Sequence, residues 1–168
     1  MRKLMKFTKR LIIILLVLNS CVGCDQATKS IAVSHLPAMK TFSYLGDTLR
    51  LQLSYNQGAF LSMGHSLPEF LRRSIFTVGT CFILLGVLIF VLSLKSGTFP
   101  VILAISLFIA GGVGNLIDRI LHDGNVVDFL NVGIGLIRTG IFNIADLAIV
   151  GGAVLLIFTA IFKQKENR

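Results

Sequence analysis

Long apolar runs with almost no charge constrain this chain more than any other feature. Residues 75–94 include no charged side chain, and residues 141–162 include only Asp146. A helix of about 20 residues crosses a bilayer core about 30 Å thick. A soluble domain of this size could not keep so much apolar surface away from water. The runs therefore indicate an integral membrane protein.

Four segments are apolar and long enough to cross a bilayer, and together they predict an all-α fold. We expect spans at about 11–33, 71–94, 100–120 and 141–162. The first of them is apolar only in its first half, because Asn19, Asp25 and Lys29 follow. We predict one integral membrane domain, 1–168, folded as a four-transmembrane-helix bundle.

The cationic side chains gather at the two ends of the chain and predict its orientation. The net charge is +8, and the terminal Lys and Arg residues are Arg2, Lys3, Lys6, Lys9, Arg10, Lys163, Lys165 and Arg168. Segments rich in Lys and Arg beside a span stay in the cytoplasm. We therefore expect both termini to be cytoplasmic. Cations that flank apolar runs do not form a groove for phosphates, so we expect no nucleic-acid partner.

The first outer loop contains a strand pattern. Apolar and polar side chains alternate over residues 48–55, with Leu49, Leu51, Leu53 and Tyr55 on one side and Arg50, Gln52 and Ser54 on the other. Alternation with period two indicates a half-buried strand. Residues 125–130 are also β-like. We expect a small β platform on the outer, periplasmic face of the bundle.

The N-terminus has an alternative interpretation. A basic start, an apolar stretch and the sequence Leu-Asn-Ser-Cys ending at Cys21 are similar to a lipoprotein signal peptide, which would be cleaved before Cys21. Three further spans follow it, and they favour a retained first helix. Cys21, Cys24 and Cys81 have neither zinc-site nor disulfide spacing, so we interpret them as small packing residues.

Carboxylates are the unusual feature of the outer face. Placing a charge near hydrocarbon costs free energy, and charged residues found there commonly have a function. With the predicted topology, every acidic residue except Glu166 lies at or beyond that face. Each has a simpler explanation as well. Asp25 could form an interfacial ion pair with Lys29, and Asp118 could form a structural clamp with Arg119. Asp128 could be a solvated loop residue, and Asp146 could only complement a helix dipole.

Two carboxylates held close together suggest a particular chemistry. They cannot both ionise cheaply, so one acts as a base toward water and the other as an acid toward a peptide carbonyl. The motifs of metalloproteases and serine hydrolases are missing from the sequence, and His35, His65 and His122 are scattered. We therefore favour an aspartic peptidase without a metal or cofactor. The alternative is a transporter or channel with Asp25 and Asp146 as ion sites.

Five short motifs then point to one family. They are Asp25-Gln-Ala-Thr-Lys29, Asn56-Gln-Gly-Ala-Phe60-Leu-Ser62, Gly111-Gly-Val-Gly114-Asn115-Leu-Ile-Asp118-Arg119, Val127-Asp128-Phe129 and Phe142-Asn143-Ile-Ala-Asp146. In this order and with these spans, the chain resembles the lipoprotein signal peptidases, also called signal peptidase II. That resemblance implies an enzyme of the bacterial inner membrane, inhibited by globomycin, that needs no metal.

The resemblance also implies a substrate and a set of site residues. The substrate would be a prolipoprotein carrying diacylglycerol on the cysteine after the cut. The catalytic pair would be Asp128 and Asp146. The residues that shape the site and bind substrate would be Asp25, Lys29, Asn56, Gly58, Asn115, Asp118, Arg119, Asn143 and Ala145. We expect membrane lipids around the protein, and we expect it to act as a monomer.

Overall fold

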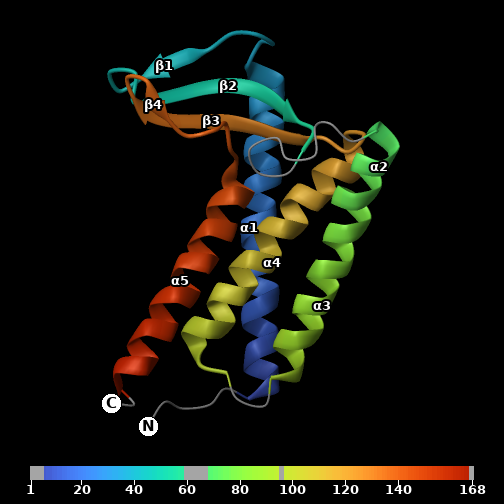
Figure 1. Cartoon of the computed structure of the whole chain (residues 1–168), viewed down its shortest axis with the longest axis vertical. Helices are drawn as coiled ribbons and strands as arrows, with labels where there is room; N and C mark the ends of the chain where they lie inside the picture. The colour runs from blue at the N-terminus through green and yellow to red at the C-terminus, as the bar shows by residue number, and fades with distance from the viewer. Residues whose placement is uncertain (1–5, 59–67, 95–96, 167–168) are drawn as a thin grey trace.

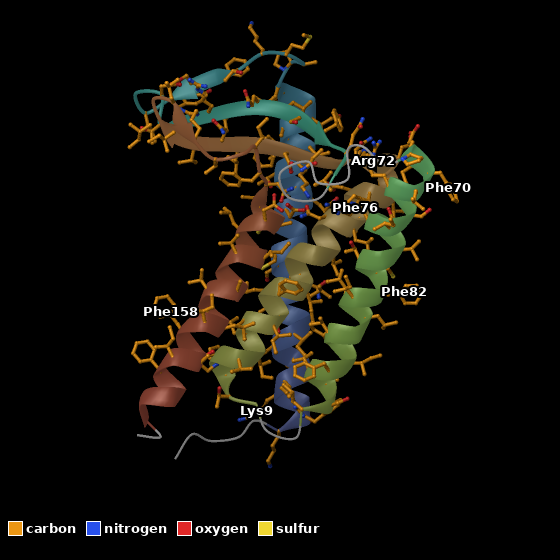
Figure 2. The ribbon with its side chains drawn as sticks, viewed as in Figure 1. Lys9, Phe70, Arg72, Phe76, Phe82 and Phe158 are labelled. Atoms are coloured by element: carbon orange, nitrogen blue, oxygen red, sulfur yellow. The ribbon has the colours of Figure 1, made fainter. Side chains whose placement is uncertain are left out.

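A sheet lies across one end of a bundle of long helices (Figure 1). The structure is a computed structural model, and it describes residues 6–58, 68–94 and 97–166. The first described residues and the end of the last helix lie together at the end of the bundle away from the sheet, where Figure 2 also shows Lys9. The architecture is therefore a bundle of apolar helices with a sheet across one of its ends.

Within the described ranges, four helices are long and apolar enough to cross a membrane. They are α1 (Phe7–His35), a second helix made of α2 (Glu69–Ser74), the π-helical turn η2 (Ile75–Gly79) and α3 (Thr80–Ser93), α4 (Phe99–Leu121), and α5 (Ile144–Glu166). Many of their large apolar side chains face outward, including Phe82 and Phe158 (Figure 2). The predicted four-helix membrane bundle is confirmed.

Helix α4 is the central helix of the bundle, because glycines let its neighbours approach. A Cβ on Gly111 would collide with the carbonyl oxygen of Ala145 in α5, and one on Gly112 would lie 2.5 Å from the Leu84 side chain in α3. The half of the bundle away from the sheet has an aliphatic core of Ile14, Val91, Ile102, Ile105 and Ile109. Small residues at helix contacts are the usual way in which membrane helices pack closely.

The start of α5 differs from the expected one at residue 141. Phe142 is still paired with Leu130 in a β-bridge, and Asn143 precedes the first helical residue, Ile144. Asp146 therefore lies in the first turn of α5 rather than one turn inside it. The sheet contact competes with the helix for these residues, and an apolar pattern cannot show that contact.

Helix α1 is continuous through Cys21, and Ile14 packs into the core. Cleavage before Cys21 would remove this buried contact, so the structure favours a retained first helix. Cys24 and Cys81 are exposed on the helix surfaces, which corrects their interpretation as packing residues. Apolar side chains can face outward here because that surface meets lipid.

The expected β platform is an antiparallel sheet with strand order β1-β2-β3-β4. The strands are β1 (Phe42–Tyr44), β2 (Leu49–Asn56), β3 (Val126–Ile134) and β4 (Ile137–Arg138). Both predicted β segments are thus confirmed. Arg138 also holds the β1–β2 turn, since its Nη1 donates to the carbonyl oxygen of Asp47 over 2.7 Å.

A β-bulge breaks the predicted alternation in β2. Leu51 is opposite Leu130, but Ser54 is opposite Asp128, so two β2 residues face Phe129 alone. A bulge of this kind inserts one residue and reverses the side on which later side chains point. The expectation that Leu53 and Tyr55 continue the face of Leu51 is therefore wrong.

Candidate active site

A buried ammonium joins two helices beneath the sheet. Lys29 of α1 lies 2.7 Å from Asp25 Oδ2 and 2.8 Å from Asp118 Oδ2 of α4. Its Nζ also donates to Asn115 Oδ1 over 3.1 Å. All three donors of the ammonium thus have acceptors. Lys29 is only 3% exposed and Asp25 only 1%. They form a buried network, not the snorkelling pair considered from spacing alone.

Asp25 also ties α1 to the first turn of α5. Its Oδ1 accepts a 2.8 Å hydrogen bond from the backbone N–H of Ala145. A Cβ on Gly114 would lie 2.7 Å from Asp25 Oδ2, so only glycine leaves room for this carboxylate. Asp25 is therefore held by a cation of its own helix and by the backbone at the start of α5.

Asp118 ties α4 to the sheet, as a structural clamp would. Its Oδ2 accepts from the backbone N–H of Val127 over 2.9 Å, while Gln26 Nε2 donates to its Oδ1 over the same distance. Val127 immediately precedes Asp128 in β3. The Lys29 network therefore fixes the strand that carries one of the two predicted catalytic carboxylates.

Asn143 and Asp146 form a reciprocal cap at the start of α5. The backbone N–H of Asp146 donates to Asn143 Oδ1 over 2.9 Å, and the backbone N–H of Asn143 donates to Asp146 Oδ2 over 3.1 Å. This is the capping-box pattern, with Asp in place of the usual Glu or Gln. Asn115 Nδ2 donates to the remaining oxygen, Asp146 Oδ1, over 2.8 Å. Asp146 is half-buried.

Asp128 lies in β3, outside the membrane-spanning helices, yet it is only 2% exposed. Its Oδ1 accepts from Asn143 Nδ2 over 2.7 Å, and its Oδ2 accepts from Asn56 Nδ2 over 3.1 Å. Burial, reinforced by the nearby charge of Asp146, raises the pKa of Asp128 to about 7. The interpretation of Asp128 as a solvated loop residue is therefore wrong.

Asn143 joins the two carboxylates, because it bonds Asp128 with its side chain and Asp146 with its backbone. One carboxylate is buried in β3 with a raised pKa, and the other is half-buried in the cap at the start of α5. Two neighbouring carboxyl groups in such different environments suit one to act as an acid and the other as a base.

A second group of residues lies beside Asp128, where β2 ends. It consists of Asn56, Gly58 and Arg119. The backbone N–H of Gly58 donates to Asn56 Oδ1 over 3.0 Å, which closes a turn after β2. Arg119 Nη2 donates to the carbonyl oxygen of Gly58 over 3.2 Å. Arg119 was expected to clamp a carboxylate, but among the described residues it forms no ion pair within 4.0 Å.

The structure brings all eleven predicted site residues into one connected region: Asp25, Lys29, Asn56, Gly58, Asn115, Asp118, Arg119, Asp128, Asn143, Ala145 and Asp146. Residues 59–62 of the second motif lie outside the described ranges. Sequence reasoning missed Gln26, whose Nε2 also donates to the Gly114 carbonyl oxygen over 3.2 Å. Its only signal was its place in the first motif.

Other polar residues of interest lie apart from this network. Thr28 donates back to the carbonyl oxygens of Cys24 and Asp25 in its own helix. Across the described ranges, no group of three His, Cys, Asp or Glu side chains is placed to hold a metal ion.

Comparison with known proteins gives a consistent result. The sequence profile of the family described as "Signal peptidase (SPase) II" matches residues 13–162. The chain is 35% identical to the lipoprotein signal peptidase of Treponema pallidum, with 98% of this chain and 91% of that protein covered. It is 32% identical to the lipoprotein signal peptidase of Syntrophus aciditrophicus, with 95% and 98% covered.

A solved structure agrees with the fold as well. A bacterial membrane enzyme determined by the in meso method at 2.3 Å resolution superposes with a TM-score of 0.78. It is 30% identical to this chain, and the comparison covers all of this chain and 96% of the other.

Proposed function

This chain belongs to the signal peptidase II family, the lipoprotein signal peptidases, and on that premise we propose that Asp128 and Asp146 are its catalytic pair. It is an aspartic endopeptidase that cleaves the signal peptides of prolipoproteins, and it is a multi-pass membrane protein of bacteria. The observation that supports this pair is the shared partner Asn143, which bonds both carboxyl groups.

The two carboxyl groups take different parts in hydrolysis. Asp146, at the start of α5, accepts a proton from water, and the resulting hydroxide attacks the scissile carbonyl carbon. Asp128 is protonated near neutral pH because burial raises its pKa to about 7, and it donates its proton to the carbonyl oxygen. When the tetrahedral intermediate collapses, one of its hydroxyl groups returns a proton to Asp128, the C–N bond breaks, and the proton held by Asp146 passes to the leaving amine.

The other site residues hold this pair and border the substrate. Lys29, Asp25 and Asp118 fix α1, α4 and β3 relative to one another. Ala145 supplies the N–H for Asp25, and Asn115 and Asn143 orient Asp146. Asn56, Gly58 and Arg119 form the border beside Asp128 that an extended peptide would meet.

We further propose a prolipoprotein substrate carrying diacylglycerol, cut before its lipidated Cys. The site lies where α4 and α5 meet the sheet, at one end of the membrane-spanning helices (Figure 1). A signal peptide anchored in the membrane would therefore present its cleavage site at the height of the carboxylates. Acyl chains buried in lipid anchor the substrate to the membrane at about 0.8 kcal/mol per buried CH₂, which keeps its cleavage site at that height.

The arrangement in the membrane is also part of the proposal. Residues 1–168 form one peptidase domain that acts as a monomer among membrane lipids. Both termini are cytoplasmic, and the sheet with the active site lies at the outer face. The basic residues at both ends support this orientation.

Single substitutions of the two carboxylates test the catalytic pair. Asp128→Asn and Asp146→Asn should each lower kcat by about 10²–10⁴-fold or more, since each removes a proton-transfer group. The assay is the gel shift of a purified, lipidated prolipoprotein in detergent, and globomycin should block the wild-type reaction. Asp47→Asn, on the sheet surface, is the matched control and should remain active. Full cleavage by either site variant would refute the pair.

A further inference from the structure

The second membrane helix, made of α2, η2 and α3, contains the π-helical turn η2, and Phe76 lies in this turn. In Figure 2 the ring of Phe76 points into the bundle toward α4, whereas Phe70 and Phe82 of the same helix point away. Phe70 and Phe82 are 81% and 70% exposed, and Phe76 is half-buried. A π-helical turn is wider than an α-helical turn and is frequent at functional sites, because it changes the direction of the side chains in it.

The ring of Phe76 meets Arg119. The guanidinium carbon of Arg119 lies 5.9 Å from the centroid of the ring, within the range of a cation–π contact. Arg119 Nε is buried and has no hydrogen-bond partner in the described part of the chain. Among the described residues, two contacts therefore hold the planar group: the Phe76 ring and the hydrogen bond from Nη2 to the Gly58 carbonyl oxygen.

A continuous series of contacts leads from this ring to the catalytic pair. Arg119 bonds Gly58, the N–H of Gly58 bonds Asn56 Oδ1 over 3.0 Å, and Asn56 Nδ2 bonds Asp128 Oδ2 over 3.1 Å. The Asn56 amide is thus fixed at its oxygen by the turn and at its nitrogen by the carboxylate. A movement of Arg119 would therefore displace Gly58 first and then Asn56.

We propose that Phe76 is a positioning residue for peptide cleavage: it holds Arg119 against the Asn56–Gly58 turn, and the turn orients Asp128. The inference rests on the proposed function of Asp128. An aliphatic side chain could fill the same space but offers no negative ring face to the cation. The aromatic ring is therefore the property that matters.

Three substitutions separate ring chemistry from packing. Phe76→Leu should lower kcat about tenfold, because it leaves Arg119 free to move away from Gly58. Phe76→Tyr keeps the ring and should stay within about twofold of wild type. Phe82→Leu changes an outward phenylalanine of the same helix and should have no effect. All three are assayed on lipidated prolipoprotein, with kcat and KM determined separately.

The pH dependence of kcat/KM distinguishes a positioning role from a general loss of stability, which would not shift its alkaline limb. The hydrogen bond from Asn56 lowers the pKa of Asp128, so its loss should shift the alkaline limb of kcat/KM in Phe76→Leu to higher pH. In the part of the chain that the structure describes, the charged groups that face Asp128 are Asp146 of α5, Lys29 of α1 and Arg119 of α4, and none of them is substituted in this variant. An unchanged limb, or a rise in KM alone, would overturn the inference.

A double-mutant cycle tests whether Phe76 acts through Arg119. In an Arg119→Gln background, Phe76→Leu should cause little further loss, because the coupled partner is already gone. Full additivity would contradict the proposal. Failure here is distinct from failure of the catalytic pair. If Asp128→Asn is inactive while Phe76→Leu behaves like wild type, only the positioning role is refuted.

Discussion

Among single residues, Asp128, the proposed acid, should determine how activity depends on pH. Its raised pKa of about 7 means that the proton that we propose it donates to the scissile carbonyl oxygen is present below that pH and is lost above it. We therefore expect kcat/KM to fall on the alkaline side with an apparent pKa near 7, a value that belongs to the coupled pair. Rates measured from pH 5 to 9 on one lipidated substrate check this. A rate that keeps rising to pH 9 would contradict the assignment of Asp128 as the acid.

The sequence identified these site residues through motifs, but it could not show their partners. Nothing in the spacing indicates that Asn143 bonds both Asp128 and Asp146, because Asp128 comes from a strand and Asp146 from a helix. The division of roles rested on the resemblance alone. Arg119 shows the limit most clearly, since its charge suggested a carboxylate partner and the structure pairs it with a backbone carbonyl and an aromatic ring.

At the level of elements, the contact between α4 and α5 should be sensitive to one methyl group. A Cβ on Gly111 would collide with the backbone carbonyl of Ala145, which cannot move without the first turn of α5. Gly111→Ala should therefore reduce the unfolding free energy by about 1–3 kcal/mol and also lower activity. Thermal unfolding in detergent and the cleavage assay measure the two effects.

Gly151→Ala in α5 is the matched control for this helix contact. No heavy atom lies within 4 Å of a Cβ built at Gly151, and the residue is exposed. Replacing a helical glycine by alanine at such a position should be neutral or should stabilise by about 0.5–1 kcal/mol. If Gly111→Ala were equally harmless, the close approach of α4 and α5 would not depend on the glycine.

The strand β2 shows why element boundaries were predicted better than their details. Alternation indicated a strand because it is a local property of the sequence. The bulge opposite Phe129 depends on pairing with β3, which lies far along the chain. It places Ser54 opposite Asp128 and Asn56 opposite Val126, so that Asn56 shares the face of Asp128 and can reach its carboxylate. The local pattern would have placed Asn56 on the other face.

For the whole molecule, the fold class could be predicted from the long uncharged runs of the sequence. Uncharged runs of this length can satisfy their backbone only as helices in a bilayer, so the bundle was predictable without any structure. What the apolar runs could not show is that α4 would be the central helix, packed through glycines against α5 and α3. That arrangement depends on contacts between helices, which the apolarity of a run does not reveal.

The orientation of the whole molecule gives the last prediction. Because we propose that the terminal Lys and Arg residues lie at the cytoplasmic side, a cysteine placed at Lys6 should be shielded from a membrane-impermeant maleimide in intact cells. A cysteine placed at Thr139, on the exposed edge of the sheet, should be labelled. Cys21, Cys24 and Cys81 are first replaced by alanine in both variants.

Two controls make this labelling experiment decisive. Both single-cysteine proteins should react fully in detergent, which shows that each thiol is accessible once the membrane is removed. Both should also cleave prolipoprotein, which shows that the native fold is retained. Labelling of Lys6→Cys but not Thr139→Cys in intact cells would reverse the topology. It would then place the carboxylates on the cytoplasmic side, away from the outer face at which we propose that prolipoproteins are cut.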